Sequence, residues 1–279
     1  MNEPSFGSTS PALRNGAGRE SILNAPTHGQ HIAHLYTERD VLVRAVGEFA
    51  GAGLRQGEAA LLVVTAAHRQ PIVRQFEDRG FAPEDLEHRG QLIILDATST
   101  LARLLVGGLP DRERFQIVIG GAVEATRPAG YPRLRAFGEM VNVLRRTSLL
   151  ATFQLEALWT ELVTAHGIAL LCGYSIDPFD PQVYEGLLQR VSAAHSHLVP
   201  VDDYARLDRA VESAYAEVFG AGQDAGFLRR TFVAHYPRPA EMPDAEAAIL
   251  AATEFVPAAA PALLERVRHH YHRAAASTA

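Results

Sequence analysis

EAALLVVTA (residues 58–66) is a continuous apolar run with valines at its centre, which is typical of a strand buried on both faces of a sheet. Two further runs of this kind occur later in the chain, QLIILDA (91–97) and IALLCGYS (168–175). Segments with helical periodicity separate these runs. Strands that alternate with helices of ten or more residues predict an α/β fold, with helices covering both faces of a mainly parallel sheet.

Several helix boundaries can be predicted from capping residues. Thr37-Glu-Arg-Asp40 resembles a capping box and opens an amphipathic helix that ends at Gly57. Ser99 stands where it can cap a helix through Leu105. A short strand, RLRAFGE (133–139), precedes a helix expected across 140–166. The turn residues after Asp177 lead into a last helix that is expected to end near His197.

One segment allows two interpretations. FQIVIGG (115–121) has the composition of a strand. However, its apolar residues and those that follow recur at helical spacing, and Asp111 stands where a helix N-cap belongs. We therefore favour a helix over about 111–127.

The two ends of the chain differ from the middle. Residues 1–27 are rich in Ser, Gly, Pro and Asn without periodicity, which predicts a disordered arm. From about residue 203 onward, apolar residues recur only at helical spacing, and prolines divide the region into short helices. We predict an arm (1–27), an α/β domain (28–200) and a helical appendage (201–279).

Composition excludes several classes of protein. All 26 basic residues are arginine, so the chain has no lysine for a P-loop or a Schiff base. The single cysteine, Cys172, excludes an intrachain disulfide and favours a reducing compartment. No apolar run approaches a membrane span, and no signal peptide is visible, so a cytoplasmic location without membrane contact is expected. The net charge of −6 argues against direct nucleic-acid binding.

Five motifs follow one another along the chain: HIAHLY (31–36), GLRQGEAALLVVT (53–65), GFAPEDLEHRGQLIILDA (80–97), RAFGEMV (135–141) and LLCGYS (170–175). Their order and spacing resemble the MEDS domain, the sensory domain of DcmR-type regulators, which is distantly similar to KaiC and RecA ATPase cores. The resemblance runs over about residues 28–198. It implies a RecA-like three-layer fold and a sensing or regulatory role, as in transcription regulation and signal transduction. It leaves the residues after 200 unexplained.

The turn after the AALLVVT strand (59–65) lacks the residues that bind phosphates in related ATPases. In active RecA-like ATPases this turn is a glycine-rich loop ending in Gly-Lys-Ser/Thr. Here it is Ala66-Ala67-His68-Arg69, with no glycine and no lysine. Arg69 offers a planar cationic fork to an anion. We expect no ATP binding and no hydrolysis, and we predict that the crevice holds a different ligand.

Histidines near the start of the domain support two interpretations. His28, His31 and His34 would share one face of a helix and could bind a metal ion or haem iron. In an extended segment, His34 and Tyr36 would instead point together into the core. Both residues match the MEDS pattern, so we take them as candidate ligand-binding residues.

The remaining candidates lie near predicted strand ends. Arg135 and Glu139 bracket the RAFGE strand and are expected at the carboxyl edge of the sheet, with Tyr174 at a neighbouring strand end. The alternative is an Arg–Glu pair, with Glu156 nearby, that only satisfies buried charge. Cys172 either packs in the core or lines the pocket with its thiol. His195 and His197 are expected at a helix C-terminus, where they meet the negative end of the helix dipole.

These observations favour a sensor without enzymatic activity. We expect the domain to bind a small organic ligand in the degenerate nucleotide-type crevice and to signal through its helical tail to a regulatory protein partner. One alternative is a nucleotide-binding or ATP-hydrolysing relative that lacks the P-loop lysine. The other is a structural assembly protein that forms homo-oligomers. The sequence identifies no cofactor.

Overall fold

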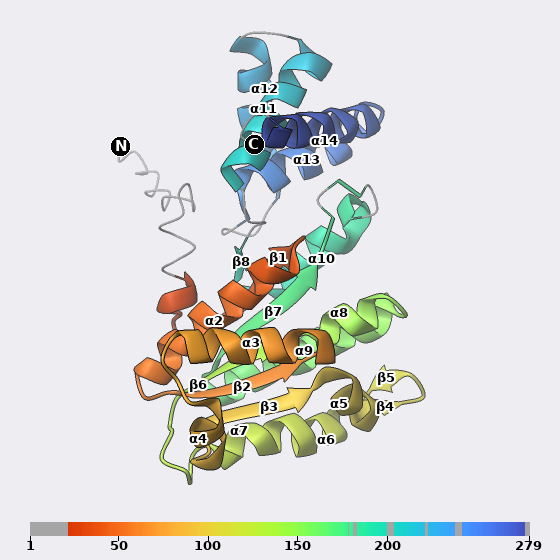
Figure 1. The fold of residues 1–279 in the computed structure, drawn as a ribbon. Helices are drawn as coiled ribbons and strands as arrows, with labels where there is room; N and C mark the ends of the chain where they lie inside the picture. The colour runs from red at the N-terminus through yellow and green to blue at the C-terminus, as the bar shows by residue number, and fades with distance from the viewer. Residues whose placement is uncertain are drawn as a thin grey trace, which may run out of the picture.

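The computed structural model describes residues 22–177, 179–180, 183–199, 204–220, 223–237 and 242–276. A sheet of six parallel strands, in the order β3-β2-β6-β7-β1-β8, forms its centre (Figure 1). The strands are β1 (His31–Tyr36), β2 (Ala59–Val64), β3 (Leu92–Asp96), β6 (Leu134–Gly138), β7 (Ala169–Ser175) and β8 (His197–Val199). A separate antiparallel pair joins β4 (Leu105–Val106) and β5 (Leu109–Pro110).

Helices pack on both faces of the sheet, which confirms the predicted three-layer α/β fold. One face is covered by α2 (Arg39–Arg55) and α3 (Ala66–Asp78), and the short α4 (Pro83–His88) adds Leu86 to the same apolar cluster. The opposite face is covered by α5 (Ala97–Leu104), α6 (Arg112–Phe115), η1 (Gln116–Gly120), α7 (Gly121–Ala125), α8 (Met140–Arg145), α9 (Leu149–His166), η2 (Val183–Leu187) and α10 (Leu188–Ala194).

The C-terminal helices gather beyond one end of the sheet, as Figure 1 shows. Phe179, in the connection between β7 and α10, joins them to the domain: its ring centroid lies 5.1 Å from that of Tyr271 and 5.4 Å from that of His272. The apolar side chains of the tail belong to the same cluster as those around α9. The helices are α11 (Tyr204–Phe219), α12 (Gln223–His235), α13 (Asp244–Phe255) and α14 (Ala260–Ala276).

The N-terminal arm predicted over residues 1–27 lies mostly outside the described residues. Its last part is described, and Leu23 is fully buried against the α2 side of the sheet. The boundary near residue 200 stays a prediction. Within the described ranges, no helix has both the length and the apolar character that crossing a membrane requires.

The segment with two interpretations is helical. Residues 112–125 form a continuous helical run through α6, η1 and α7, and the Asp111 side chain caps it by accepting the Arg114 N–H at 2.9 Å. The strand alternative is therefore excluded. By contrast, the predicted capping box at Thr37 is wrong. Helix α2 begins at Arg39, so its N-cap residue is Glu38, and the Glu38 side chain makes no capping hydrogen bond.

Three other boundaries need correction. Asp96, rather than Ser99, caps α5, since its carboxylate accepts the Ser99 N–H at 2.8 Å. The helix expected across 140–166 is divided, because Ser148 caps a new helix by accepting the Ala151 N–H at 3.1 Å. The last helix ends at Ala194, and His197 begins an additional strand. The run at 91–97 also forms an edge strand, β3, in which only Leu92 is buried.

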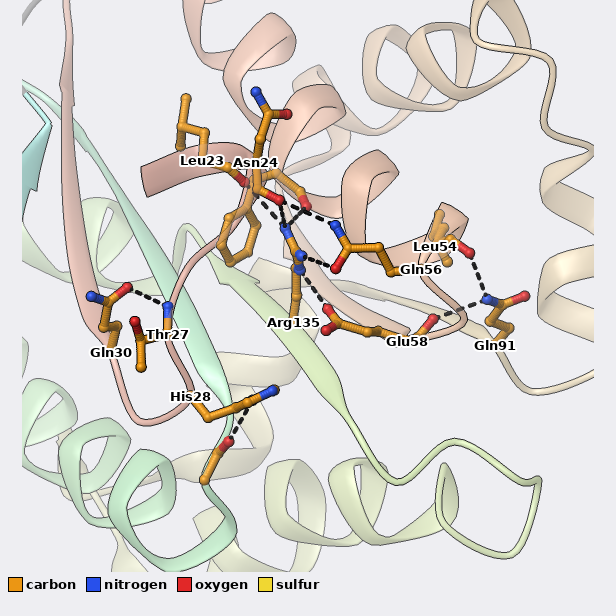
Figure 2. A network of polar contacts seen from close by, with 12 residues as sticks. Leu23, Asn24, Thr27, His28, Gln30, Leu54, Gln56, Glu58, Gln91 and Arg135 are labelled. Carbon is orange, nitrogen blue, oxygen red and sulfur yellow. Dashed lines mark hydrogen bonds and ion pairs between the residues drawn. The ribbon is translucent and has the colours of Figure 1, made fainter. Parts of the chain in front are cut away.

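A buried arginine ties the amino end of the sheet together, as Figure 2 shows. Arg135 is only 2% exposed, and its Nε lies 2.5 Å from Glu58 Oε2. Its Nη1 donates to the backbone carbonyls of Leu23, Asn24 and Phe49 at 3.2, 3.1 and 2.9 Å. One side chain therefore joins β6, the start of β2, helix α2 and the N-terminal segment.

Gly53 makes room for this side chain. A Cβ atom added at Gly53 would lie 2.7 Å from both Cδ and Nε of Arg135. Glycine-to-alanine substitution inside a helix ordinarily stabilises by up to about 1 kcal/mol. Here we expect Gly53→Ala to destabilise by about 1–3 kcal/mol, because the ion pair must shift. Urea unfolding measures the change.

The matched control is Gly121→Ala in α7. Apart from its chain neighbours and the backbone of its own helix, no described atom lies within 4 Å of a Cβ added at Gly121. This variant should be neutral or more stable than the wild type. If Gly53→Ala also stabilises the protein, the packing of Arg135 against α2 is looser than the structure indicates.

Candidate functional site

The turn between β2 and α3 binds a carboxylate of the protein itself. Glu139 follows β6 directly and its side chain is fully buried. Its Oε2 accepts the Thr65 N–H at 2.7 Å and the Thr65 hydroxyl at 3.2 Å, and its Oε1 is bound to His68 Nδ1. The backbone N–H of Glu139 also donates to Val63 at 3.0 Å, which joins the carboxyl ends of β2 and β6.

This contact has a direct consequence for phosphate binding. The N-terminus of a helix that follows a strand carries partial positive charge and unpaired N–H groups, which is why phosphates bind there. In this chain the Glu139 carboxylate already occupies the start of α3. A triphosphate would have to displace this buried carboxylate, which is negatively charged like the phosphates. Arg69 does not face this position, because its half-exposed side chain points to Glu87 at 3.9 Å.

Tyr36 and its neighbours complete this group at the carboxyl end of β1. The Tyr36 hydroxyl accepts a hydrogen bond from Asn142 Nδ2 at 3.3 Å. Its ring stacks near that of His34, with centroids 6.2 Å apart, and meets the edge of His68 at 6.4 Å. Burial, assisted by the Glu139 charge, raises the pKa of Tyr36 well above its usual range. We call His34, Tyr36, His68, Glu139 and Asn142 the edge site.

The edge site has limited contact with solvent. The His68 side chain is 14% exposed, whereas Glu139 and His34 are fully buried. Ligand binding here therefore requires a small molecule or a movement of the β2–α3 turn. His68 and Asn142 were missing from the sequence-based site, although His68 stands in the turn that lacks the phosphate-binding residues. Only the folded contact with Glu139 identifies it.

A second polar group lies on the opposite face of the sheet, inside an apolar core. Glu156, on α9, is at its centre: its Oε2 lies 3.2 Å from His31 Nε2, 3.6 Å from His195 Nε2 and 3.9 Å from Cys172 Sγ. The Tyr174 hydroxyl donates to the other carboxylate oxygen, Oε1. We call these five residues the core cluster, and all of them are buried.

The sheet register explains why these residues meet. In parallel β1 and β7, Ala33 is paired with Cys172 and Leu35 with Tyr174. Side chains at alternate positions of a strand share a face. His31 therefore points to the same face as Cys172 and Tyr174, toward α9. His195 joins them from the C-terminal end of α10.

Burial and mutual contact set the protonation of the core cluster. Burial alone would raise the pKa of Glu156, but contacts with His195, His31 and Tyr174 outweigh it and the pKa is lowered. Burial lowers the pKa of His195 to about 4. Burial and the Glu156 charge raise the pKa of the Cys172 thiol and of the Tyr174 hydroxyl. At neutral pH the cluster thus holds a carboxylate, a neutral His195 and a protonated thiol.

The structure separates the predicted site residues into groups. His34, Tyr36 and Glu139 lie together at the carboxyl edge as expected, while Glu156, Cys172 and Tyr174 lie on the other face. Tyr174 lies near the carboxyl end of β7 as expected, but its side chain points to the face of the sheet opposite Tyr36, so the two do not share a site. Arg135 is also misplaced, since it lies at the amino end of β6 and pairs with Glu58.

The histidine triplet does not form a shared site. The segment is extended, so His31 and His34 face opposite sides of the sheet, and exposed His28 lies 3.1 Å from the Gly167 carbonyl. His31 alone reaches the core cluster. The sequence placed His195 at a helix C-terminus, and its approach to Glu156 depends on the tertiary fold.

Comparison with known proteins identifies one family. The family model described as "MEthanogen/methylotroph, DcmR Sensory domain" (MEDS) matches residues 30–195, more than half of the 279-residue chain. The matched range contains both the edge site and the core cluster. No curated protein gives a significant match.

Proposed function

Because the chain belongs to the MEDS family of sensory domains, we propose that it is a regulatory protein that senses a small organic ligand at the edge site and signals to a partner through its helical tail. The proposal includes a cytoplasmic location and no enzymatic turnover. It supposes two states of the domain that differ in affinity for the ligand, since a ligand shifts an equilibrium only through such a difference.

The carboxylate of Glu139 at the start of α3 is the observation that supports this proposal most directly. It lies where a turn of this kind would bind a phosphate, and it places a buried acceptor, an imidazole and a phenol together at the carboxyl edge of a parallel sheet. Ligands of open α/β sheets bind at this edge. A compact molecule with a hydrogen-bonding head suits the three groups.

A short series of contacts leads from the edge site to the tail. Helix α8 begins directly after Glu139, and Arg145 at its end donates to the Ser175 carbonyl at 2.6 Å. Ser175 ends β7, and the following connection carries Phe179, whose ring contacts Tyr271 of α14. A ligand that moves Glu139 would shift α8 and, through Arg145, the segment on which the tail packs.

Nucleotide and small-ligand binding give opposite expectations in a thermal-shift assay. We expect Mg·ATP to leave the unfolding temperature unchanged and to show no turnover, because Glu139 fills the anion position. Native mass spectrometry of the purified full chain should show a copurified organic molecule. Failing that, at least one member of a series of short-chain alcohols and carboxylates should stabilise the protein.

Variants locate the response. His68→Ala should abolish ligand-induced stabilisation, whereas the matched control His88→Ala, at an exposed position in α4, should keep it. Stabilisation by Mg·ATP that is lost in His68→Ala would instead support the nucleotide-binding alternative. An unchanged response to the organic probe in His68→Ala would show that the pocket is elsewhere.

A further inference from the structure

The core cluster has the donor set and the spacing of a metal site. His31 Nε2, Glu156 Oε2, Cys172 Sγ and His195 Nε2 all lie within 4.8 Å of one another, and all four residues are buried. We propose that these four side chains bind one divalent transition-metal ion, for which zinc is the best match. This site lies on the opposite face of the sheet from the edge site, and the inference does not depend on the proposed function.

Four of the six separations between ligand atoms are close to those of a tetrahedron, and the other two, from His195 to His31 and to Cys172, are within 4.8 Å. Zinc bonds of about 2.0–2.3 Å to nitrogen, oxygen and sulfur place neighbouring ligand atoms about 3.3–3.6 Å apart. The measured separations are 3.2 Å for His31–Glu156, 3.3 Å for His31–Cys172, 3.6 Å for His195–Glu156 and 3.9 Å for Cys172–Glu156. An ion at the centre would need only small movements of these side chains.

Both imidazoles are oriented for binding through Nε2. His195 Nδ1 lies 2.6 Å from the Val191 carbonyl, which can only accept, so Nδ1 carries the proton. His31 Nδ1 lies 3.1 Å from Thr160 Oγ1. The Thr160 hydroxyl donates to the Glu156 carbonyl at 3.0 Å, so it accepts from His31. Metal binding requires both rings to be neutral, and both Nε2 atoms then direct lone pairs into the cluster, in the pattern that outer hydrogen bonds impose on metal-binding histidines.

Without a cation this arrangement is unfavourable. Within the described residues, His195 Nε2 makes no hydrogen bond, and it lies 3.6 Å from a carboxylate oxygen that also carries lone pairs. A buried nitrogen without a partner destabilises the folded state, because it has lost its hydrogen bonds to water. A metal ion would bind both lone pairs at once. Tyr174 already occupies Oε1 of Glu156, which leaves Oε2 as a single ligand atom.

The donor types favour zinc. Two imidazoles, a carboxylate and a thiolate form a mixed set that suits a tetrahedral, borderline-soft ion, whereas magnesium and calcium prefer oxygen ligands alone. Metal binding requires the Cys172 thiol to lose its proton, which is released to solvent. The dication then balances one carboxylate and one thiolate, so the occupied cluster is neutral.

The test begins with the full chain stripped of metal by a chelator and then titrated with cobalt or zinc. We expect one tightly bound equivalent of zinc, release of protons on binding and a higher unfolding temperature. Cobalt should give the intense visible bands of a tetrahedral site together with a thiolate-to-cobalt charge-transfer band. Because Cys172 is the sole cysteine, that band reports directly on this residue.

Substitutions distinguish this site from other histidines. Cys172→Ser and His195→Gln should weaken zinc binding by about 10- to 100-fold. The double variant His269→Gln/His272→Gln, at exposed positions of α14, is the matched control and should retain the tight equivalent. A wild-type chain that stays folded but binds no metal, or binds cobalt without the thiolate band, would overturn the proposal even if the cluster variants failed to fold. In that case the core cluster is a buried ion pair alone.

Discussion

Arg135→Leu should lower the free energy of unfolding by about 3–5 kcal/mol, because it removes one partner of a buried ion pair. The variant leaves Glu58 as a buried carboxylate without its cation. It also leaves the carbonyls of Leu23, Asn24 and Phe49 without their guanidinium donor. Urea unfolding followed by circular dichroism measures the loss.

The matched control is Arg69→Leu, which removes a half-exposed arginine with a 3.9 Å contact to Glu87. A surface pair of this kind contributes less than about 1 kcal/mol. The double variant Arg135→Leu/Glu58→Leu should recover part of the stability, because it removes the uncompensated charge. If Arg135→Leu changes stability by less than about 1 kcal/mol, the structural role of the ion pair is refuted.

Glu246→Gln should stabilise the protein at alkaline pH and have little effect near pH 4.5. Glu246 lies in α13 and is 2% exposed, and its carboxyl oxygens make no hydrogen bond to any other described residue. Burial, with smaller contributions from Asp208 and Asp244, raises its pKa from 4.5 to about 8. Between pH 4.5 and about pH 8, this carboxyl group is therefore protonated in the folded protein and ionised in the unfolded chain.

The sign of the effect follows from this proton. Stability should be highest below pH 4.5 with respect to this group and should fall as pH rises toward 8, by up to about 1.4 kcal/mol per pH unit. Glutamine keeps the shape and does not titrate, so its advantage over the wild type should grow over the same interval. Unfolding free energies from about pH 5 to about pH 9 measure the difference.

Glu254→Gln, at an exposed position of the same helix, is the control and should follow the wild-type pH profile. Parallel profiles for the wild type and Glu246→Gln would contradict the prediction. They would mean that water reaches this carboxyl group where α13 packs against η2.

The strands could be predicted because a parallel strand buried on both faces is apolar without interruption. β2 and β7 are of this kind, and every residue of β2 is buried. The helix over residues 112–125 could be predicted because its buried residues, Phe115, Ile119 and Val123, recur at helical spacing. β3 was predicted as buried on both faces, but edge position depends on strand order, which no local pattern contains.

Site residues were harder to predict because they meet through strand order and register. Arg135 could pair with Glu139 or with a more distant acid, and its partner, Glu58, is 77 residues away. Alternation within β1 correctly placed His34 and Tyr36 on one face. Whether Tyr174 shared that face depended on the register of β7 against β1. His31 and Cys172, 141 residues apart, meet for the same reason.

The position of β1 also determines the order in which the chain can complete its sheet. Among the strands of the described residues, β1 is synthesised first, yet both of its neighbours, β7 and β8, come last. At about 5–20 residues per second on the ribosome, the 141 residues between His31 and Cys172 take roughly 7–30 s to appear. During that time the apolar HIAHLY segment has no strand to pair with, so nascent chains that stop before residue 169 expose it to chaperones and to aggregation.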